Sequence, residues 1–228
     1  DIDLNKANLI KEKHHIHLST SITELAASCD VIILGVLPDQ LDIVFDELSK
    51  VLTNQMIFSI AVGITLEKLS ALAKKNVTIV RTMPNIGAMI GRSMTSYCVN
   101  KTVTEKESDV IHTFLNSFGK AVKIKEEKFD EFTALCGSSP VFYLEIMDAM
   151  INYGLSHDFN YQDTVKMVSE AMIASAQLLQ ESRLKPKELI NKIATKGGTT
   201  EVGLKVLNQY KIDEIIFCSK ICKVISSI

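Results

Sequence analysis

A short polar segment, residues 195–200, stands directly ahead of an apolar helical pattern. Gly197 and Gly198 allow the backbone to turn with its amides unobstructed. Thr199 or Thr200 can then serve as the N-cap of the helix. The first amides of a helix lack intrahelical partners, and together with the helix dipole they favour an anion. The segment therefore predicts a site for a small carboxylate, although the same residues are also typical of a plain helix start.

Three other segments follow apolar, β-branched runs that are typical of buried strands. They are Gly35-Val36-Leu37-Pro38, Ala61-Val62-Gly63 and Met83-Pro84-Asn85. Because open α/β sheets bind ligands at the carboxyl ends of their strands, we expect these segments to line a cleft. The Asn85 carboxamide offers a donor and an acceptor there, but asparagine after proline is also a common turn former.

Residues 1–125 alternate short β-branched runs with helical stretches, which is typical of an α/β domain with a parallel sheet and crossover helices. The near-continuous apolar runs indicate a sheet covered on both faces. We expect strands at residues 31–36, 56–62, 77–83, 93–99 and 121–125, with helices at residues 38–52, 65–74 and 104–118.

Residues 126–228 show no strand signals and predict a second, all-helical domain. Between Val141 and Leu155 nearly every position is apolar except Glu145, Asp148 and Asn152, so this helix is expected to be buried almost all round. A further long helix is expected at residues 161–181. About one hundred residues cannot bury this much apolar helix alone, which favours a partner chain.

The composition excludes some classes of protein. The 25 basic and 27 acidic residues are interspersed and give a net charge of −2, so no nucleic-acid or membrane-surface partner is expected. Apolar runs fall short of a bilayer span, and no signal peptide is recognised. Five cysteines without a CxxC pair indicate reduced thiols in a cytoplasmic protein. His14, His15 and His17 have no carboxylate or cysteine at ligand spacing, so we expect no metal site.

A dinucleotide-binding domain opens with a strand, a GxGxxG turn and a helix that holds the pyrophosphate. No such segment precedes Asp1, so we expect this domain to be incomplete at its start. Residues 1–5 then correspond to the end of the second strand. There Asp1 or Asp3 would accept hydrogen bonds from the adenosine ribose and repel a 2′-phosphate, which favours NADH.

Three motifs follow one another in the chain: RTMPN at residues 81–85, GSSP at residues 137–140 and KGGTTEVGL at residues 196–204. Together they resemble the pyrroline-5-carboxylate reductases, from about Asp30 to the C-terminus. The resemblance implies reduction of 1-pyrroline-5-carboxylate to L-proline with NADPH or NADH, the last step of proline biosynthesis. It also implies a homodimer through the helical domain, often assembled further into rings.

The resemblance assigns roles to the segments described above. Gly197, Gly198, Thr199 and Thr200 would bind the substrate. The Thr200 hydroxyl would bond its ring nitrogen, and Thr195 would support the same pocket. The cofactor would lie against Gly35, Val36, Leu37, Pro38, Ala61, Val62, Gly63, Met83 and Asn85. The chain departs from the family pattern at Leu37, Gly87, Ser139 and Lys196.

Two alternatives stay open at this point. One is a β-hydroxyacid dehydrogenase, a class that uses a catalytic lysine on an interdomain helix, since Lys192 and Lys196 lie near the expected site. The other is a catalytically inactive paralogue that keeps the dimer fold, because four motif positions differ from the family pattern.

Overall fold

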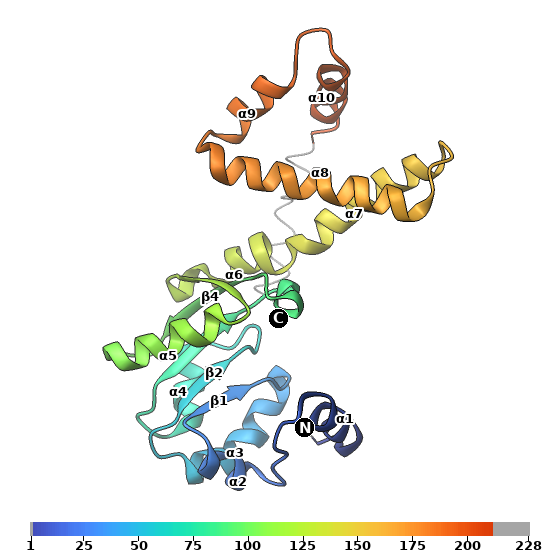
Figure 1. Ribbon diagram of the computed structural model, residues 1–228. Helices are drawn as coiled ribbons and strands as arrows, with labels where there is room; N and C mark the ends of the chain where they lie inside the picture. Colours follow the sequence, from blue (N-terminus) through green and yellow to red (C-terminus); the bar gives the residue numbers. More distant parts are fainter. Residues whose placement is uncertain (1, 212–228) are drawn as a thin grey trace. The chain divides into compact units, whose positions relative to one another are not determined.

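The computed structural model describes residues 2–211, which form two compact units (Figure 1). The first unit contains residues 2–137 and the second begins at Ser138. The first unit is an α/β domain and the second is all-helical. Cys218 and Cys222, with the rest of the C-terminal segment, lie outside the described residues.

The first unit is built on a five-stranded sheet in the order β1-β2-β3-β4-β5. The strands are β1 (Val31–Leu34), β2 (Met56–Ser59), β3 (Ile79–Met83), β4 (Ser93–Val99) and β5 (Gly119–Lys123). All neighbouring pairs are parallel except β3 and β4, which are antiparallel. The sheet is therefore mixed rather than uniformly parallel. The connection from β3 to β4, residues 84–92, is too short for a crossover helix and can join only antiparallel neighbours.

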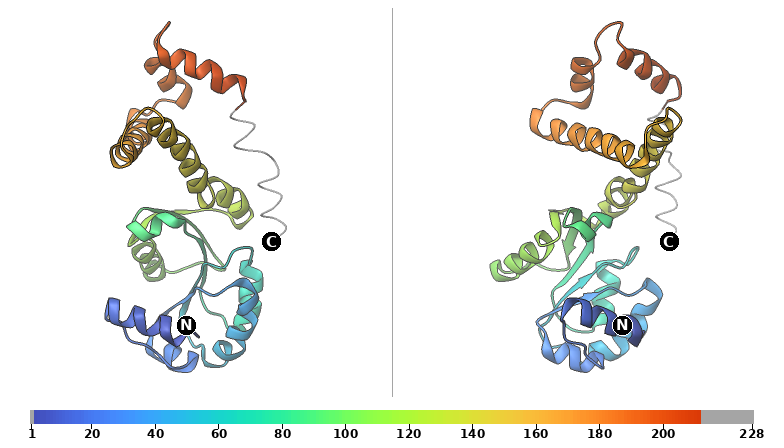
Figure 2. Two further views of the ribbon diagram at one scale, coloured as in Figure 1. Left: turned by 90° about the vertical axis from the view of Figure 1, so that its right-hand side faces the viewer. Right: turned by 45° about the vertical axis from the view of Figure 1, so that its right-hand side comes forward.

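Helices cover the two faces of this sheet, which lies between them in the left view of Figure 2. On one face α2 (Ile22–Ser28), α3 (Leu41–Val51) and α4 (Leu66–Ala73) contribute to a core in which Leu41, Ile57 and Leu69 are fully buried. On the other face α5 (Glu105–Asn116) buries Ile111 and Leu115 against β2, β3 and β4. The apolar runs of the strands are explained by this two-sided burial.

Residues 2 and 3 are not part of a strand, contrary to the expectation for the start of the chain. Asp3 is the N-cap of α1 (Leu4–His14), and its Oδ1 accepts hydrogen bonds from the amides of Asn5 and Lys6. Amides in the first turn of a helix have no acceptor within the helix, and the aspartate side chain supplies one. One carboxylate oxygen is thus already engaged within the chain.

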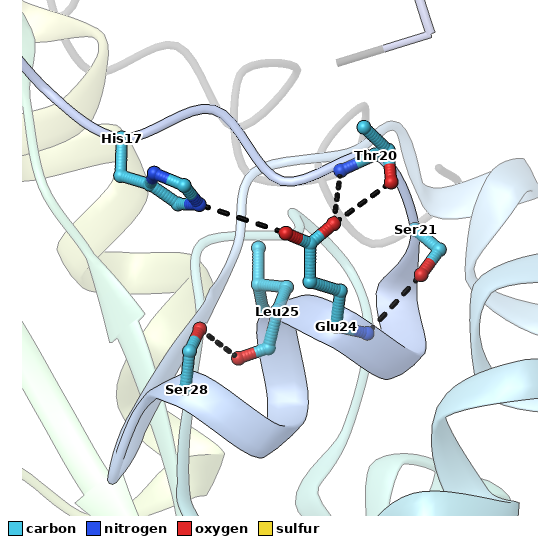
Figure 3. Close-up of polar contacts among 6 residues, drawn as sticks. All are labelled: His17, Thr20, Ser21, Glu24, Leu25 and Ser28. Atoms are coloured by element: carbon cyan, nitrogen blue, oxygen red, sulfur yellow. Dashed lines mark hydrogen bonds and ion pairs between the residues drawn. The ribbon is translucent and has the colours of Figure 1, made fainter.

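The next helix, α2, begins with a reciprocal capping arrangement (Figure 3). Ser21 Oγ accepts from the amide of Glu24, while Glu24 Oε2 accepts from the amide and hydroxyl of Thr20. The other Glu24 oxygen lies 3.6 Å from His17 Nε2. His17 therefore contacts the carboxylate that takes part in capping this surface helix.

Residues 126–137 belong to the sheet unit, twelve positions beyond the expected domain boundary at residue 125. They form η3 (Glu126–Lys128), α6 (Phe129–Phe132) and a π-helical turn at Thr133–Gly137, called the π-turn below. Phe129 is 3% exposed and packs in the core beside Ile79 and Cys98. This burial explains why the segment stays with the sheet although its sequence is helical.

The second unit contains α7 (Ser139–Leu155), α8 (Tyr161–Ser182), α9 (Pro186–Ile193) and α10 (Thr199–Gln209). Gly154 lets the end of α7 approach α8, because a Cβ there would lie 2.6 Å from Thr164 Cγ2. Within the described part of this unit, the buried residues are Ser139, Thr164 and Val168, and each keeps between 2% and 8% of its surface exposed. A unit with so little interior of its own needs further partners for its apolar side chains.

α7 leaves much of its apolar surface uncovered in the single chain, with Val141, Leu144, Met150 and Tyr153 between 49% and 68% exposed. The helical stretch Glu126–Leu155 is long and apolar enough to cross a membrane by length and composition alone. An apolar helix that packs against a second protein chain passes the same test, so this observation does not by itself indicate a membrane protein.

Candidate active site

The carboxyl ends of β1, β2 and β3 lie side by side. Leu34 pairs with Ser59, and Ser59 pairs with Arg81, so the segments that follow these strands are neighbours. The Ile60 amide donates to the Leu34 carbonyl at 3.3 Å across this edge. The three expected cofactor segments are therefore brought together at the edge where open α/β sheets bind nucleotides.

The segment after β1 is ordered by its own side chains and turn. Pro38 begins a 3₁₀ turn, η1 (Pro38–Gln40), and Gln40 Oε1 accepts from the Leu37 amide at 3.2 Å. The Leu37 side chain, where the family pattern has lysine, is 63% exposed. Around Gly35 a Cβ would meet nothing closer than 4.0 Å, so the backbone here is open to approach.

The segment after β2 forms a tight turn. Ala61 is buried and donates its amide to Ser59 Oγ at 3.3 Å, whereas Val62 is exposed. Gly63 has a φ of 75°, a left-handed conformation that favours glycine. This turn leads into Thr65, whose hydroxyl caps α4. Residues 61–63 therefore present main-chain atoms, and no charged side chain of their own, at the carboxyl edge of the sheet.

Asn85, after β3, uses its side chain within the protein. Its Oδ1 accepts from the Gly87 amide at 3.1 Å and its Nδ2 donates to the Cys136 carbonyl at 3.0 Å. Asn85 therefore caps η2 (Ile86–Ile90) and holds the π-turn, instead of presenting a free carboxamide at the edge. Gly87 is required by packing, because a Cβ there would lie 2.5 Å from the Arg92 carbonyl oxygen.

The Met83 side chain is half-buried and turns toward the π-turn, where a Cβ on Gly137 would lie 3.4 Å from Met83 Cε. Burial raises the pKa of the Cys136 thiol in this turn. Cys136 therefore stays a neutral thiol at neutral pH and is not an activated nucleophile. The edge formed by these segments thus offers main-chain and apolar groups.

The segment ahead of α10 begins the helix one residue earlier than the sequence suggested. Gly198, rather than Thr199 or Thr200, is the N-cap, and it has no side chain with which to cap. Gly197 has a φ of 77°, a left-handed conformation that suits glycine. A Cβ on Gly198 would lie 2.8 Å from Thr195 Oγ1, so Thr195 packs directly against the N-cap.

Four amides at this helix start differ in their availability. Gly198 donates to the Thr195 carbonyl at 3.0 Å, and Gly197 donates to Glu201 Oε2 at 2.7 Å. Among the described residues, the amides of Thr199 and Thr200 have no hydrogen-bond acceptor. These two amides, at the positive end of an eleven-residue helix, are where an anion can bind.

Glu201 is a member of this site that the motif comparison did not single out. Its carboxylate bonds the Gly197 amide and forms an ion pair with Lys205 at 3.3 Å. The Gly197 hydrogen bond, and then Lys205, hold the pKa of Glu201 below its ordinary value. An acidic residue in the first helical turn, four positions before a lysine, was the available sequence signal.

The expected site residues thus form two groups. Gly35, Val36, Leu37, Pro38, Ala61, Val62, Gly63, Met83 and Asn85 gather at the sheet edge of the first unit. Thr195, Gly197, Gly198, Thr199 and Thr200 gather at the start of α10 in the second unit. Within each group the residues are close together, as the sequence pattern suggested.

A largely parallel sheet with crossover helices and open loops at its carboxyl edge defines a Rossmann-type nucleotide-binding domain. Residues 126–219 match the family model for pyrroline-5-carboxylate reductase dimerisation. The chain is 33% identical over 204 residues to a pyrroline-5-carboxylate reductase of Aquifex aeolicus, covering 90% of this chain and 76% of the relative. The chain belongs to the pyrroline-5-carboxylate reductase family.

Solved structures agree with this assignment. A pyrroline-5-carboxylate reductase from Streptococcus pyogenes superimposes with a TM-score of 0.86 and 28% identity, covering 99% of this chain and 86% of that one. A Plasmodium falciparum pyrroline carboxylate reductase, solved with NADP bound, gives a TM-score of 0.85 and 26% identity over 92% and 80% of the two chains. Both units of the chain therefore have counterparts in solved members of the family.

Proposed function

We propose that this protein reduces 1-pyrroline-5-carboxylate to L-proline with NADPH or NADH. The observation that carries the proposal is the start of α10, where Thr199 and Thr200 present two amides without acceptors among the described residues. A helix start of this kind suits a small carboxylate, and it lies in a chain whose relatives are named as reductases of this substrate.

The nicotinamide supplies a hydride to the imine carbon when the cofactor is bound. The work of the protein is then to place the two reactants in contact and to hold the ring nitrogen in its protonated form. The amides of Thr199 and Thr200 bind the substrate carboxylate. The Thr200 hydroxyl accepts a hydrogen bond from the protonated ring nitrogen and so orients the imine bond.

Neighbouring residues shape this pocket. Thr195 packs against Gly198 and fixes the approach to the helix start, while Glu201 holds the Gly197 amide away from the substrate. The cofactor lies along the carboxyl edge of β1, β2 and β3, in contact with main chain of residues 35–38 and 61–63. The Leu37 amide is engaged by Gln40 Oε1, so other main-chain groups of the first segment make the contact.

The protein acts as a homodimer through its helical unit. The uncovered apolar faces of α7 and α8, and a groove lined by Leu178, Leu179, Leu189 and Ile190, are the surfaces that a second copy covers. Cys29, Cys98 and Cys136 are free thiols, which is consistent with a reducing, cytoplasmic location.

The test is a reduction assay with the full-length protein, which follows NAD(P)H oxidation in the presence of 1-pyrroline-5-carboxylate and identifies proline as the product. Oxidation of 3-hydroxyisobutyrate without reduction of the imine would instead establish a β-hydroxyacid dehydrogenase. A dimer that binds no NAD(P)H by fluorescence and turns over neither substrate would establish an inactive paralogue.

A further inference from the structure

Asn85 joins three segments of the sheet unit that are separated in the sequence. Its Oδ1 closes the turn to Gly87, its amide donates to Ser93 Oγ at 3.1 Å, and its Nδ2 reaches the Cys136 carbonyl, 51 positions along the chain. The end of β3, the start of β4 and the π-turn are thereby tied at one residue. Both polar atoms of the carboxamide are used in doing so.

The Cys136 carbonyl needs this donor because of the residue that follows it by four positions. Cys136 lies in the π-turn, ahead of Ser138, the N-cap of α7, so an α-helical donor for its carbonyl would be residue 140 and a π-helical donor would be residue 141. Residue 140 is proline and has no N–H. The Val141 amide donates to the Ser138 carbonyl instead, at 3.1 Å. Asn85 Nδ2 supplies the hydrogen bond that Pro140 cannot make.

The π-turn is also packed closely against the end of β3. A Cβ on Gly137 would lie 3.4 Å from both Met83 Cε and Thr133 Cγ2. Thr133 Oγ1 donates to the Phe129 carbonyl at 2.7 Å and so satisfies another main-chain group of this region. The hydrogen bond from Asn85 therefore acts on a segment that already rests against the cofactor edge.

We propose that Asn85 is a positioning residue that fixes the π-turn to the cofactor edge of the sheet. Hydride transfer requires reacting atoms about 3–3.5 Å apart, so a loosened π-turn lowers the rate of the chemical step. This role rests on the proposed reductase activity. It differs from direct cofactor binding, because Oδ1 and Nδ2 each make a hydrogen bond within the sheet unit.

Two variants distinguish a positioning role of Asn85 from a role that only supplies a hydrogen bond to the Cys136 carbonyl. Asn85→Ser keeps an oxygen that can accept from the Gly87 amide but cannot reach Cys136. Pro140→Ala restores an N–H that can donate to the Cys136 carbonyl without tying it to β3. In the double variant the Cys136 carbonyl therefore has a hydrogen-bond donor, but the π-turn is no longer bonded to the residue that follows β3.

The experiment measures kcat, the Kd for NADPH, thermal unfolding and amide hydrogen exchange of residues 133–141 in the full-length protein. For Asn85→Ser we expect a kcat lower by about tenfold to a hundredfold, NADPH affinity nearly unchanged, a Tm lower by a few degrees and faster exchange in the π-turn. In the double variant we expect the Tm to recover while kcat stays low.

Three results would overturn the proposal: wild-type kcat in Asn85→Ser, a loss of rate matched by a loss of NADPH affinity, or recovery of kcat in the double variant. If the wild-type protein does not reduce the imine, the proposed function fails, and hydrogen exchange then decides the role of Asn85. Faster amide exchange of residues 133–141 in Asn85→Ser supports the proposal that Asn85 holds the π-turn, and unchanged exchange overturns it.

Discussion

Arg81 on β3 and Glu126 on η3 form an ion pair of 2.8 Å between Arg81 Nη1 and Glu126 Oε1, beside the ring of Phe129. The same Glu126 oxygen accepts from the Leu66 amide at the start of α4, at 2.6 Å. The Arg81 side chain is 8% exposed, and the Glu126 carboxylate offsets the burial of its positive charge. One carboxylate thus connects the middle of β3 with the helix that follows the turn at Ala61–Gly63.

Replacing Glu126 with glutamine should destabilise the sheet unit. Removing one partner of a fully buried pair costs about 3–5 kcal/mol, and because Glu126 is one-third exposed we expect roughly 2 kcal/mol here. Glu127→Gln is the matched control, since its pair with Lys125 is exposed and should contribute less than about 1 kcal/mol. Chemical denaturation measures both, and equal small losses would show that the Arg81 pair is dispensable.

Met150→Asp should dissociate the dimer. Met150 is 49% exposed in the single chain, and in the proposed dimer it lies on the covered apolar face of α7. A charge buried there without a partner is costly, whereas Met150→Leu keeps an apolar side chain and should remain dimeric. Sedimentation velocity at micromolar concentration distinguishes these results. A Met150→Asp protein that stays dimeric would place the interface elsewhere.

Gly198→Ala should disturb the start of α10. The added Cβ would lie 2.8 Å from Thr195 Oγ1 and 3.2 Å from the Thr195 carbonyl oxygen, so Thr195 must move. We expect kcat/KM for the imine to fall by at least tenfold, because the pocket wall moves with it. Gly203→Ala in the same helix is the control, since a Cβ there meets nothing within 4 Å. Similar activity in both variants would show that the position of Thr195 does not matter for the substrate pocket.

Stability at acid pH should reflect Glu201. The Gly197 hydrogen bond and Lys205 lower its pKa in the folded protein, so this contact stabilises fully above the ordinary carboxyl pKa of 4.5. The stabilisation is lost as pH falls through the lower pKa of the folded state. We therefore expect wild type to be more stable than Glu201→Gln at pH 7 and the difference to vanish in acid. A difference that does not change with pH would contradict this account.

The sequence predicted the strands well because burial on both faces imposes continuous apolar runs, and 93–99 is a strand over its full predicted length. Strand direction was not encoded in those runs. Only the short connection at residues 84–92 carried that information. The sequence does not predict helix α1, because residues 1–5 fit the end of a strand, although Asp3 is a common N-cap residue.

At the site, the residue types at the start of α10 were predictable and their hydrogen bonds were not. Which amides remain free depends on the left-handed backbone of Gly197 and on Glu201. The partner of Asn85 lies 51 positions away, beyond the reach of local patterns. The absent N–H of Pro140 removes one local donor for the Cys136 carbonyl, but it does not identify the residue that takes its place.

The most direct test of the central claim is the kcat of Thr200→Val in the full-length protein, with folding checked by circular dichroism. Valine keeps the shape of threonine but removes the hydroxyl that orients the protonated ring nitrogen. We expect kcat to fall by on the order of 10²- to 10⁴-fold, the usual effect of losing a positioned hydrogen-bonding group. Thr199→Val, at the neighbouring position, should keep most of its activity. Near-normal turnover by Thr200→Val would reduce this threonine to part of a helix start and contradict the proposed mechanism.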